Sequence, residues 1–143
     1  MLKYSARTVT FFKQLIVRKN RAKRDAIYGV CGLIRRSAIN RLKVRPGPSS
    51  EGASPHAHTL GGLRVIRFAV SGNTGIIGPV RFPNSKKYNK PVPAIQEFGG
   101  TVFTLGRVFR QVNYAARPYM SKTIETLRGR IPKEFSVQLG KVL

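Results

Sequence analysis

Few residues of this 143-residue chain have the types and spacing that a reactive site needs. His56-Ala-His58 offers two imidazoles, whereas a zinc site takes three or four protein ligands. Acid–base catalysis needs groups held together in a shaped site. The chain has five acidic residues, and no two lie close in sequence: Asp25, Glu51, Glu97, Glu125 and Glu134. We therefore expect no catalytic residue, no metal site and no cofactor.

The glycine pairs and the single cysteine also favour structural roles. Gly61-Gly62 and Gly99-Gly100 lack the spacing of a phosphate-binding loop and its following Lys-Ser/Thr. Cys31 is the one cysteine, which excludes an intrachain disulfide and indicates a reducing compartment. Its apolar neighbours predict a small buried core residue.

The net charge is the most unusual property of the chain. Lys and Arg number 27 against five acids, for a net charge of +22. Such an excess goes beyond what solubility needs and indicates a polyanionic neighbour, nucleic acid first of all. The alternative is a generic basic surface.

Size and composition favour one folded domain, 1–143, whose first part, 1–24, is a basic helical arm. Hydrophobic residues make up 41% of the chain, and no apolar run reaches the ~18 residues that a membrane span requires. The first 24 residues contain eight basic residues and no acid, a composition shared with mitochondrial presequences. The apolar set in this region fits the face of an ordinary short helix equally well: Val9, Phe12, Leu15 and Ile16.

The N-terminal half predicts helices. Residues 5–18 form one helix, 19–24 form a charge cluster, and 25–43 show apolar residues at intervals of three and four. We expect Gly29 and Gly32 to permit close packing against a sheet. The helix should end before Arg45, because Pro46 disfavours a helical residue ahead of it.

The rest of the chain predicts two hairpins and a closing helix. Exposed loops are expected at 46–62 and 81–91. Strands are expected at 63–70 and 74–80, then at 101–105 and 108–114, with a helical turn at 93–98 between the hairpins. Arg117-Pro118 starts a helix with a regular apolar face, which Pro132 kinks or ends: Met120, Ile124, Leu127 and Ile131. The fold class is α+β, an antiparallel sheet of two hairpins packed by a long N-terminal helix and a C-terminal helix.

Six segments in a fixed order carry a resemblance to a known family. They are Gly32–Asn40, Gly52–Thr59, Gly62–Arg64, Gly75–Pro79, Ile95–Gly100 and Ala116–Met120. Together they resemble the tailed-phage neck and tail-completion family, which includes the lambdoid minor tail protein Z and related head–tail joining proteins. The resemblance covers about residues 26 to 135, and its specificity comes from order and spacing.

The resemblance implies a structural protein of the virion, assembled in the host cytoplasm, that runs no reaction. It implies a ring of six or twelve copies between head and tail. The neighbours would be head-completion or connector proteins and tail-terminator or tail-tube proteins, with duplex DNA passing through the lumen and no membrane. Contacts with that DNA would be independent of sequence.

Candidate residues follow from this role. Residues expected to face the lumen or an acidic neighbouring ring are, first, Arg81, Lys86, Lys87 and Lys90, and second, Arg35, Arg36, Arg41 and Lys43. For each of them a solvated surface position is the alternative. Six further residues are expected to have structural roles, in a turn, a helix start and an ion pair between Glu97 and Arg117. They are Glu97, Phe98, Gly99, Gly100, Arg117 and Pro118.

Two other functions compete with this one. A ribosomal or other RNA-binding protein would explain the charge, although the chain lacks RNA-binding aromatic motifs and its basic residues are spread over both halves. A small basic enzyme is disfavoured by the shortage of acids.

Overall fold

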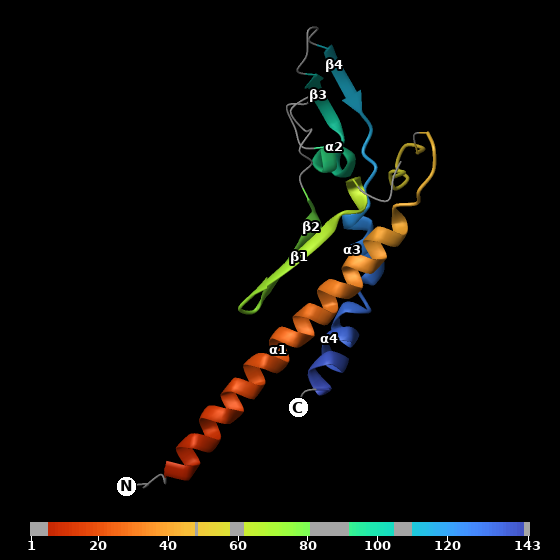
Figure 1. Cartoon of the computed structure of the whole chain (residues 1–143). Coiled ribbons are helices and arrows are strands. Elements are labelled where there is room, and N and C mark those ends of the chain that lie inside the picture. Colours follow the sequence, from red (N-terminus) through yellow and green to blue (C-terminus); the bar gives the residue numbers. More distant parts are fainter. Residues whose placement is uncertain (1–5, 48, 58–61, 81–91, 105–109, 142–143) are drawn as a thin grey trace.

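The structure, a computed structural model, describes residues 6–47, 49–57, 62–80, 92–104 and 110–141. It confirms an α+β fold with a long N-terminal helix, two antiparallel hairpins and C-terminal helices packed on the first helix. The elements in order are α1 (Ala6–Arg41), the 3-10 turn η1 (Gly62–Arg64), β1 (Ile66–Ser71), β2 (Thr74–Pro79), α2 (Val92–Phe98), β3 (Gly100–Thr104), β4 (Arg110–Tyr114), α3 (Met120–Leu127) and α4 (Ile131–Gly140). Figure 1 shows the first hairpin, α3 and α4 along the C-terminal half of α1, with α2 and the second hairpin beyond its end.

Helix α1 is one continuous helix of 36 residues, so the prediction of two helices separated by a charge cluster is wrong. The cluster 19–24 consists mostly of Lys, Arg and Ala, which are good helix formers. The helix ends at Arg41, two residues before the predicted end. Beyond it the backbone pairs with a loop, since the Ala57 N–H donates to the Lys43 carbonyl at 3.0 Å and Val44 forms a parallel bridge with Ala57.

The two hairpins form separate two-stranded sheets. In the first, Ile66 pairs with Pro79 and Ser71 pairs with Thr74 around the turn; in the second, Gly100 pairs with Tyr114. Gly72 in the first turn has φ +56°, the left-handed region that favours glycine. Because a two-stranded ribbon is barely stable alone, the first hairpin depends on packing against α1, which both β1 and β2 contact.

Close packing between α1 and its neighbours differs from the prediction. A Cβ on Gly75 of β2 would lie 2.6 Å from Cys31 Sγ, so the glycine that lets sheet and helix approach belongs to the strand. Gly29 of α1 lies against α4 instead, where a Cβ would lie 2.6 Å from Cγ of Gln138. Gly32 has no such neighbour within 4 Å. Cys31 is buried, as predicted.

The core lies where the C-terminal half of α1 meets the first hairpin and α3. One cluster consists of Ala38, Leu42, Ala57, Ile66 and Tyr119, and a second consists of Leu33, Ile34 and Leu127. The loop predicted to be exposed over 46–62 contributes to this core. Ser49, Pro55 and Ala57 are buried, and the prediction needs correction at these positions because the loop folds back along residues 43–44.

The closing helix is divided into two. Helix α3 ends at Leu127 and α4 begins at Ile131, so the break precedes Pro132, which lies in the first turn of α4. The predicted apolar face is also only partly a core face. Leu127 is buried, whereas Ile124 is 46% exposed.

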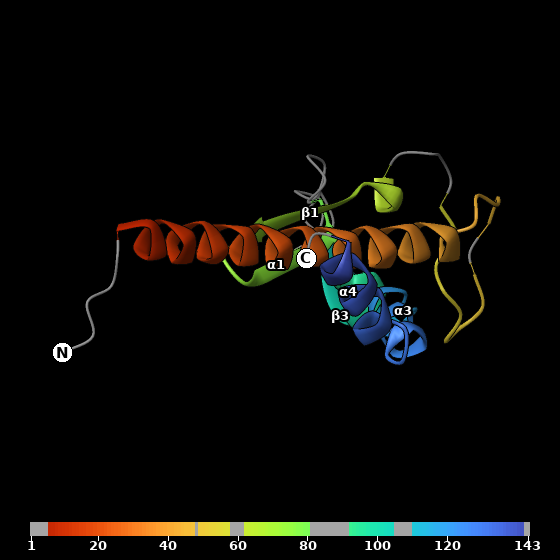
Figure 2. The ribbon, with the colours of Figure 1, turned by 90° about the horizontal axis from the view of Figure 1, so that it is seen from below.

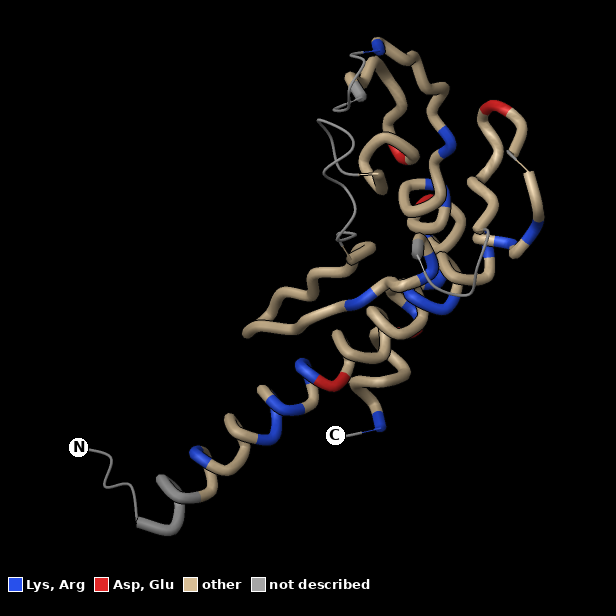
Figure 3. Tube along the Cα trace, turned by 45° about the horizontal axis from the view of Figure 1, so that its top comes forward, with Lys and Arg blue, Asp and Glu red and all other residues tan. Residues whose placement is uncertain are grey.

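The first half of α1 extends beyond the rest of the chain that the structure describes (Figures 1 and 2). Every residue from Phe11 to Arg21 is exposed, and we call this segment the arm. Its large apolar residues are 49–66% exposed: Phe11, Phe12, Leu15, Ile16 and Val17. The arm also contains four basic residues and no acid (Figure 3): Lys13, Arg18, Lys19 and Arg21.

Candidate functional site

Glu97 caps helix α3, and this contact joins two distant segments of the chain. Its Oε2 accepts hydrogen bonds from the backbone N–H groups of Tyr119 at 2.9 Å and Met120 at 3.0 Å, and its Oε1 accepts one from Ser121 at 2.8 Å. Tyr119, the residue before α3, makes no side-chain cap of its own. A carboxylate from α2 therefore satisfies donors that the first turn of a helix cannot satisfy itself, and it stabilises the positive end of the helix dipole.

This cap sets the ionisation of Glu97. Burial raises its pKa, but hydrogen bonds from the Ser121 side chain and from the backbone of Tyr119, Ser121 and Met120 outweigh burial and hold the pKa below its ordinary value of 4.5. Burial, and secondarily the charge of Glu97, raises the pKa of Tyr119. Glu97 is thus an anion with a structural task.

The predicted ion pair between Glu97 and Arg117 is wrong. The Glu97 carboxylate lies against the backbone of α3, and Arg117 uses its Nε to donate to the Ser49 carbonyl at 3.1 Å. The Arg117 backbone N–H donates to the Gln96 carbonyl at 2.7 Å. Arg117 thus links the end of α2 to the buried loop, and hydrogen bonds to backbone replace the expected pair of charges.

Gly99 and Gly100 form the turn that the sequence predicted. Gly99 has φ +63° and Gly100 has φ +100°. A Cβ on Gly99 would lie 2.6 Å from the Ala116 nitrogen and 2.7 Å from the Tyr114 oxygen, so only glycine fits against this backbone. Residues 96–100 and 114–121 together form one unit, which we call the α2–α3 joint.

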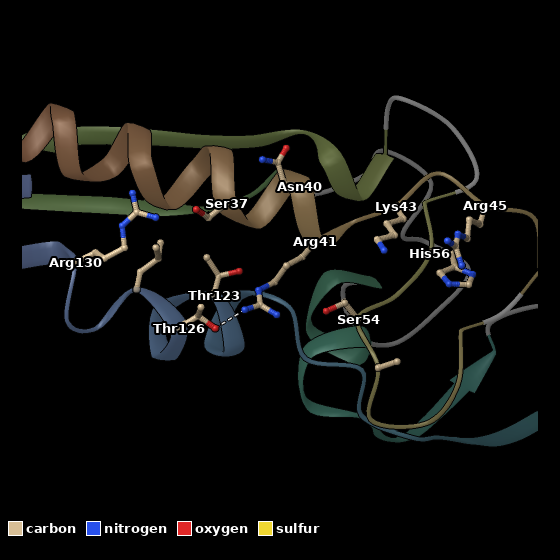
Figure 4. A pocket seen from close by; sticks show the side chains of 12 residues that line it. Ser37, Asn40, Arg41, Lys43, Arg45, Ser54, His56, Thr123, Thr126 and Arg130 are labelled. Atoms are coloured by element: carbon tan, nitrogen blue, oxygen red, sulfur yellow. Dashed lines mark hydrogen bonds between the residues drawn. The ribbon is translucent and has the colours of Figure 1, made fainter.

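A basic pocket lies beside the joint, between the end of α1, the loop 43–57 and the α3–α4 junction (Figure 4). Its volume is about 590 Å³. No acidic residue lines it among the residues that the structure describes. The cationic and potentially cationic groups that line it are Arg41, Lys43, Arg45, Arg130 and His56.

Hydroxyl groups lie among these cations. Thr126 accepts a hydrogen bond from the Arg41 guanidinium, which fixes that side chain across the floor of the pocket (Figure 4). Ser54 and Ser37 also line it. Guanidinium and ammonium groups with neighbouring hydroxyls match the oxygens of a phosphate, so the chemistry of this pocket suits a phosphodiester or a carboxylate.

The basic residues predicted from the sequence differ in where the structure places them. Arg41 and Lys43 line the pocket, as stated. Arg35 donates from Nε to the Ile66 carbonyl at 2.7 Å and thereby fastens α1 to β1, and Arg36 is exposed. The first group, Arg81, Lys86, Lys87 and Lys90, lies outside the described residues.

Sequence reasoning missed Arg45, His56 and Arg130. Arg45 follows Lys43 closely and could have been included from sequence. Arg130 comes from the α3–α4 junction, 85 or more positions away along the chain, and no pattern in the sequence connects it with the end of α1. Only the packing of α3 on α1 brings it to the pocket.

Searches of family models, curated proteins and solved structures find no match to this chain. Within the described residues, no group of three His, Cys, Asp or Glu side chains is placed to hold a metal ion. In the same part of the chain, none of the helices has the length and apolar character to cross a bilayer. The features that bear on function are therefore the basic pocket, the α2–α3 joint and the exposed surfaces.

Proposed function

We propose that the chain is a structural subunit of the head–tail connector region of a tailed-phage particle, a neck or tail-completion protein. In this role it forms an oligomeric ring around the DNA channel, joins head to tail and catalyses no reaction. Its neighbours are the adjoining connector and tail proteins, and duplex DNA passes through its lumen.

The observation that carries this proposal is the apolar surface left open at separate places on a very basic chain. Phe11 and Val17 of the arm are 60% and 66% exposed, and Phe98 at the end of α2 is 79% exposed. The exposed apolar residues of the arm are neighbours along one helix, and contiguous exposed apolar surface of this kind usually marks a site of association. These surfaces are explained if neighbouring subunits or proteins cover them in an assembly.

The joint gives a second line of support. Two of the six segments behind the family resemblance, Ile95–Gly100 and Ala116–Met120, are the ones that Glu97 and Gly99 bring together. Their residue types have a shared physical reason: a carboxylate for the cap, a glycine for the close approach and a helix start to receive both. Two of the segments that carry the resemblance therefore belong to one structural unit, the α2–α3 joint.

The basic pocket gives this subunit a surface for the phosphate backbone. Three of its four Lys and Arg residues follow the end of α1 or close it, the fourth lies at the α3–α4 junction, and none faces an acidic partner in the pocket lining. A channel that must pass DNA of every sequence needs contacts of this type, which depend on the charge of the phosphates and not on the identity of the bases.

The test is the oligomeric state and location of the full chain. Mass photometry and negative-stain imaging of the purified protein at moderate salt should show closed rings of six or twelve copies, or rings formed on the adjoining neck proteins. Antibody labelling of purified particles should place it at the junction of head and tail. Absence from particles would overturn the proposal.

A ribosomal or other RNA-binding protein is the second candidate, and the basic pocket is the observation that favours it. The two functions differ in ligand preference. A monomer that binds RNA tightly at low salt and duplex DNA far more weakly would support the alternative, whereas equal, salt-sensitive binding of both supports the neck.

A further inference from the structure

The arm presents an apolar face on which no described segment of the chain packs. Phe12, Leu15 and Ile16 follow the i, i+3, i+4 spacing of one helix face and are 49–57% exposed. Phe11 lies one turn from Leu15, and its ring meets Phe12 edge to face with centroids 6.0 Å apart. Val17 lies on the opposite side of the helix. The arm thus carries a stripe of aromatic and aliphatic side chains among basic residues.

A groove on the body of the chain has complementary properties. It lies between β2, α2 and α3, has a volume of about 400 Å³ and is lined mainly by apolar residues. Phe98, 79% exposed, and Ile124, 46% exposed, lie along it. Its described lining contains one acid, Glu97, and no Lys or Arg, in a chain that has 27 of them.

The arm cannot fill this groove within its own chain. It points away from α2 and α3, and the body of the chain gathers at the other end of α1 (Figure 1). A receptor for the apolar face of the arm must therefore come from outside the subunit.

Charge selects between the available receptors. The basic pocket carries four Lys and Arg residues and would repel the basic arm. Two arms in contact would also repel each other, because each carries four positive charges. The α2–α3 groove combines apolar walls with a carboxylate. A second apolar groove of about 390 Å³, between α1, β2 and α4, has no acid in its described lining, so the α2–α3 groove is the better match in charge for the basic arm.

We infer that the arm of one copy seats its Phe12–Leu15–Ile16 face in the α2–α3 groove of the next copy. This contact joins two different surfaces, so it repeats head to tail and closes into a ring when the rotation per subunit allows it. The inference deepens the proposed function and rests on its self-association, but it specifies which surfaces meet.

Cysteine cross-linking in trans tests the contact. In a Cys31→Ala background, one preparation carries Ile16→Cys and a second, with a small mass tag, carries Ile124→Cys. Mild oxidation of the mixture should give a disulfide-linked heterodimer. The matched control replaces Ile124→Cys by Val137→Cys, which is 55% exposed on α4 and lies outside the groove.

The expected heterodimer yield with Ile124→Cys is at least about tenfold above that with Val137→Cys, since a seated contact holds the two thiols within bonding distance. Equal yields, or a predominant arm-to-arm product, would overturn the inference. So would a groove cysteine that stays unreactive because another segment of the same chain fills the groove.

A charge substitution gives an independent readout that does not need cysteine. Ile16→Glu should shift the concentration midpoint of self-association by at least about tenfold, because a buried carboxylate in an apolar contact is strongly unfavourable. Val17→Glu adds the same charge on the opposite side of the arm and should shift it by less than about twofold. Both sites are exposed, so neither variant should impair folding. Equal shifts would contradict the inference.

The outcomes separate this inference from the proposed function. Rings without the trans cross-link would refute the arm-to-groove contact and leave the neck role standing. A trans cross-link in a protein that forms only open chains and is missing from particles would refute the neck role and leave the contact standing. A chain that stays monomeric at every concentration and gives no cross-link refutes the contact.

Discussion

The arm and the α2–α3 joint use different residue types for different purposes. In the joint, one carboxylate accepts three backbone hydrogen bonds, and one glycine lies against the backbone of residues 114–116. In the arm, five large apolar residues and four basic residues contact solvent. The contacts of the joint are all made within one chain, whereas the side chains of the arm form a helix but remain exposed to solvent. This difference separates the part that stabilises the fold from the part available for assembly.

The largest expected difference comes from the same Leu→Ala substitution made just beyond the C-terminal end of α1 and in the arm. Leu42→Ala removes a side chain that is 1% exposed and should lower the free energy of unfolding by about 2–5 kcal/mol. Leu15→Ala removes one that is 49% exposed and should change it by less than about 0.5 kcal/mol in the monomer. Urea unfolding monitored by circular dichroism measures both. Similar losses would mean that the arm is packed in solution.

A second pair of variants sharpens the account of the joint. Gly99→Ala combines a positive φ with a clash against backbone atoms, and should cost about 2–3 kcal/mol. Gly47→Ala has φ +79° but open space around it, and should cost about 1 kcal/mol from the backbone alone. Thermal unfolding of the two variants compares them directly. A loss of stability at Gly99 no greater than at Gly47 would show that the close approach of the backbone to Gly99 does not require glycine.

The cap is the next smaller effect. Glu97→Gln keeps an oxygen acceptor but removes the charge at the start of α3, and should destabilise the protein by about 1 kcal/mol at neutral pH. Glu125→Gln removes a charge from an exposed position of the same helix and should have little effect. Chemical unfolding of both variants at low salt measures the difference, and equal stabilities would show that the charge of Glu97 adds nothing to the cap.

The same variant predicts a pH dependence with a defined sign. The folded pKa of Glu97 lies below its ordinary value of 4.5, so its stabilisation is fully present above that value and is lost as pH falls through the folded pKa. The gap in stability between the native protein and Glu97→Gln should therefore close on acidification. A gap that stays constant from pH 7 to pH 3 contradicts the shift.

The smallest effect concerns the basic pocket. Arg130→Gln should reduce the slope of log K against log salt for duplex DNA by about 0.9, the value for one phosphate contact. Arg128→Gln, exposed and outside the pocket lining, should reduce it by less. Fluorescence anisotropy over a salt series measures both slopes. Equal reductions would indicate diffuse attraction by the whole surface.

The sequence by itself determined the secondary structure of most of the chain and the general character of its surface. Apolar spacing along 25–43 and the Gly72 turn are local properties, so the C-terminal half of α1 and the first hairpin were predictable. The glycine turn at 99–100 was predictable for the same reason. Net charge depends on composition alone, which made a polyanionic partner an early expectation.

Tertiary structure decided which residues act together. Glu97 was expected to pair with Arg117 because opposite charges attract, yet three unsatisfied N–H groups at the start of α3 hold the carboxylate more effectively. Arg130 reaches Arg41 only through the packing of α3 on α1. The sequence showed an apolar face in both halves of α1, but only the fold decided that one half is covered and the other is open. The physical reason is that burial and hydrogen-bond partners depend on long-range packing, which no local pattern of residues encodes.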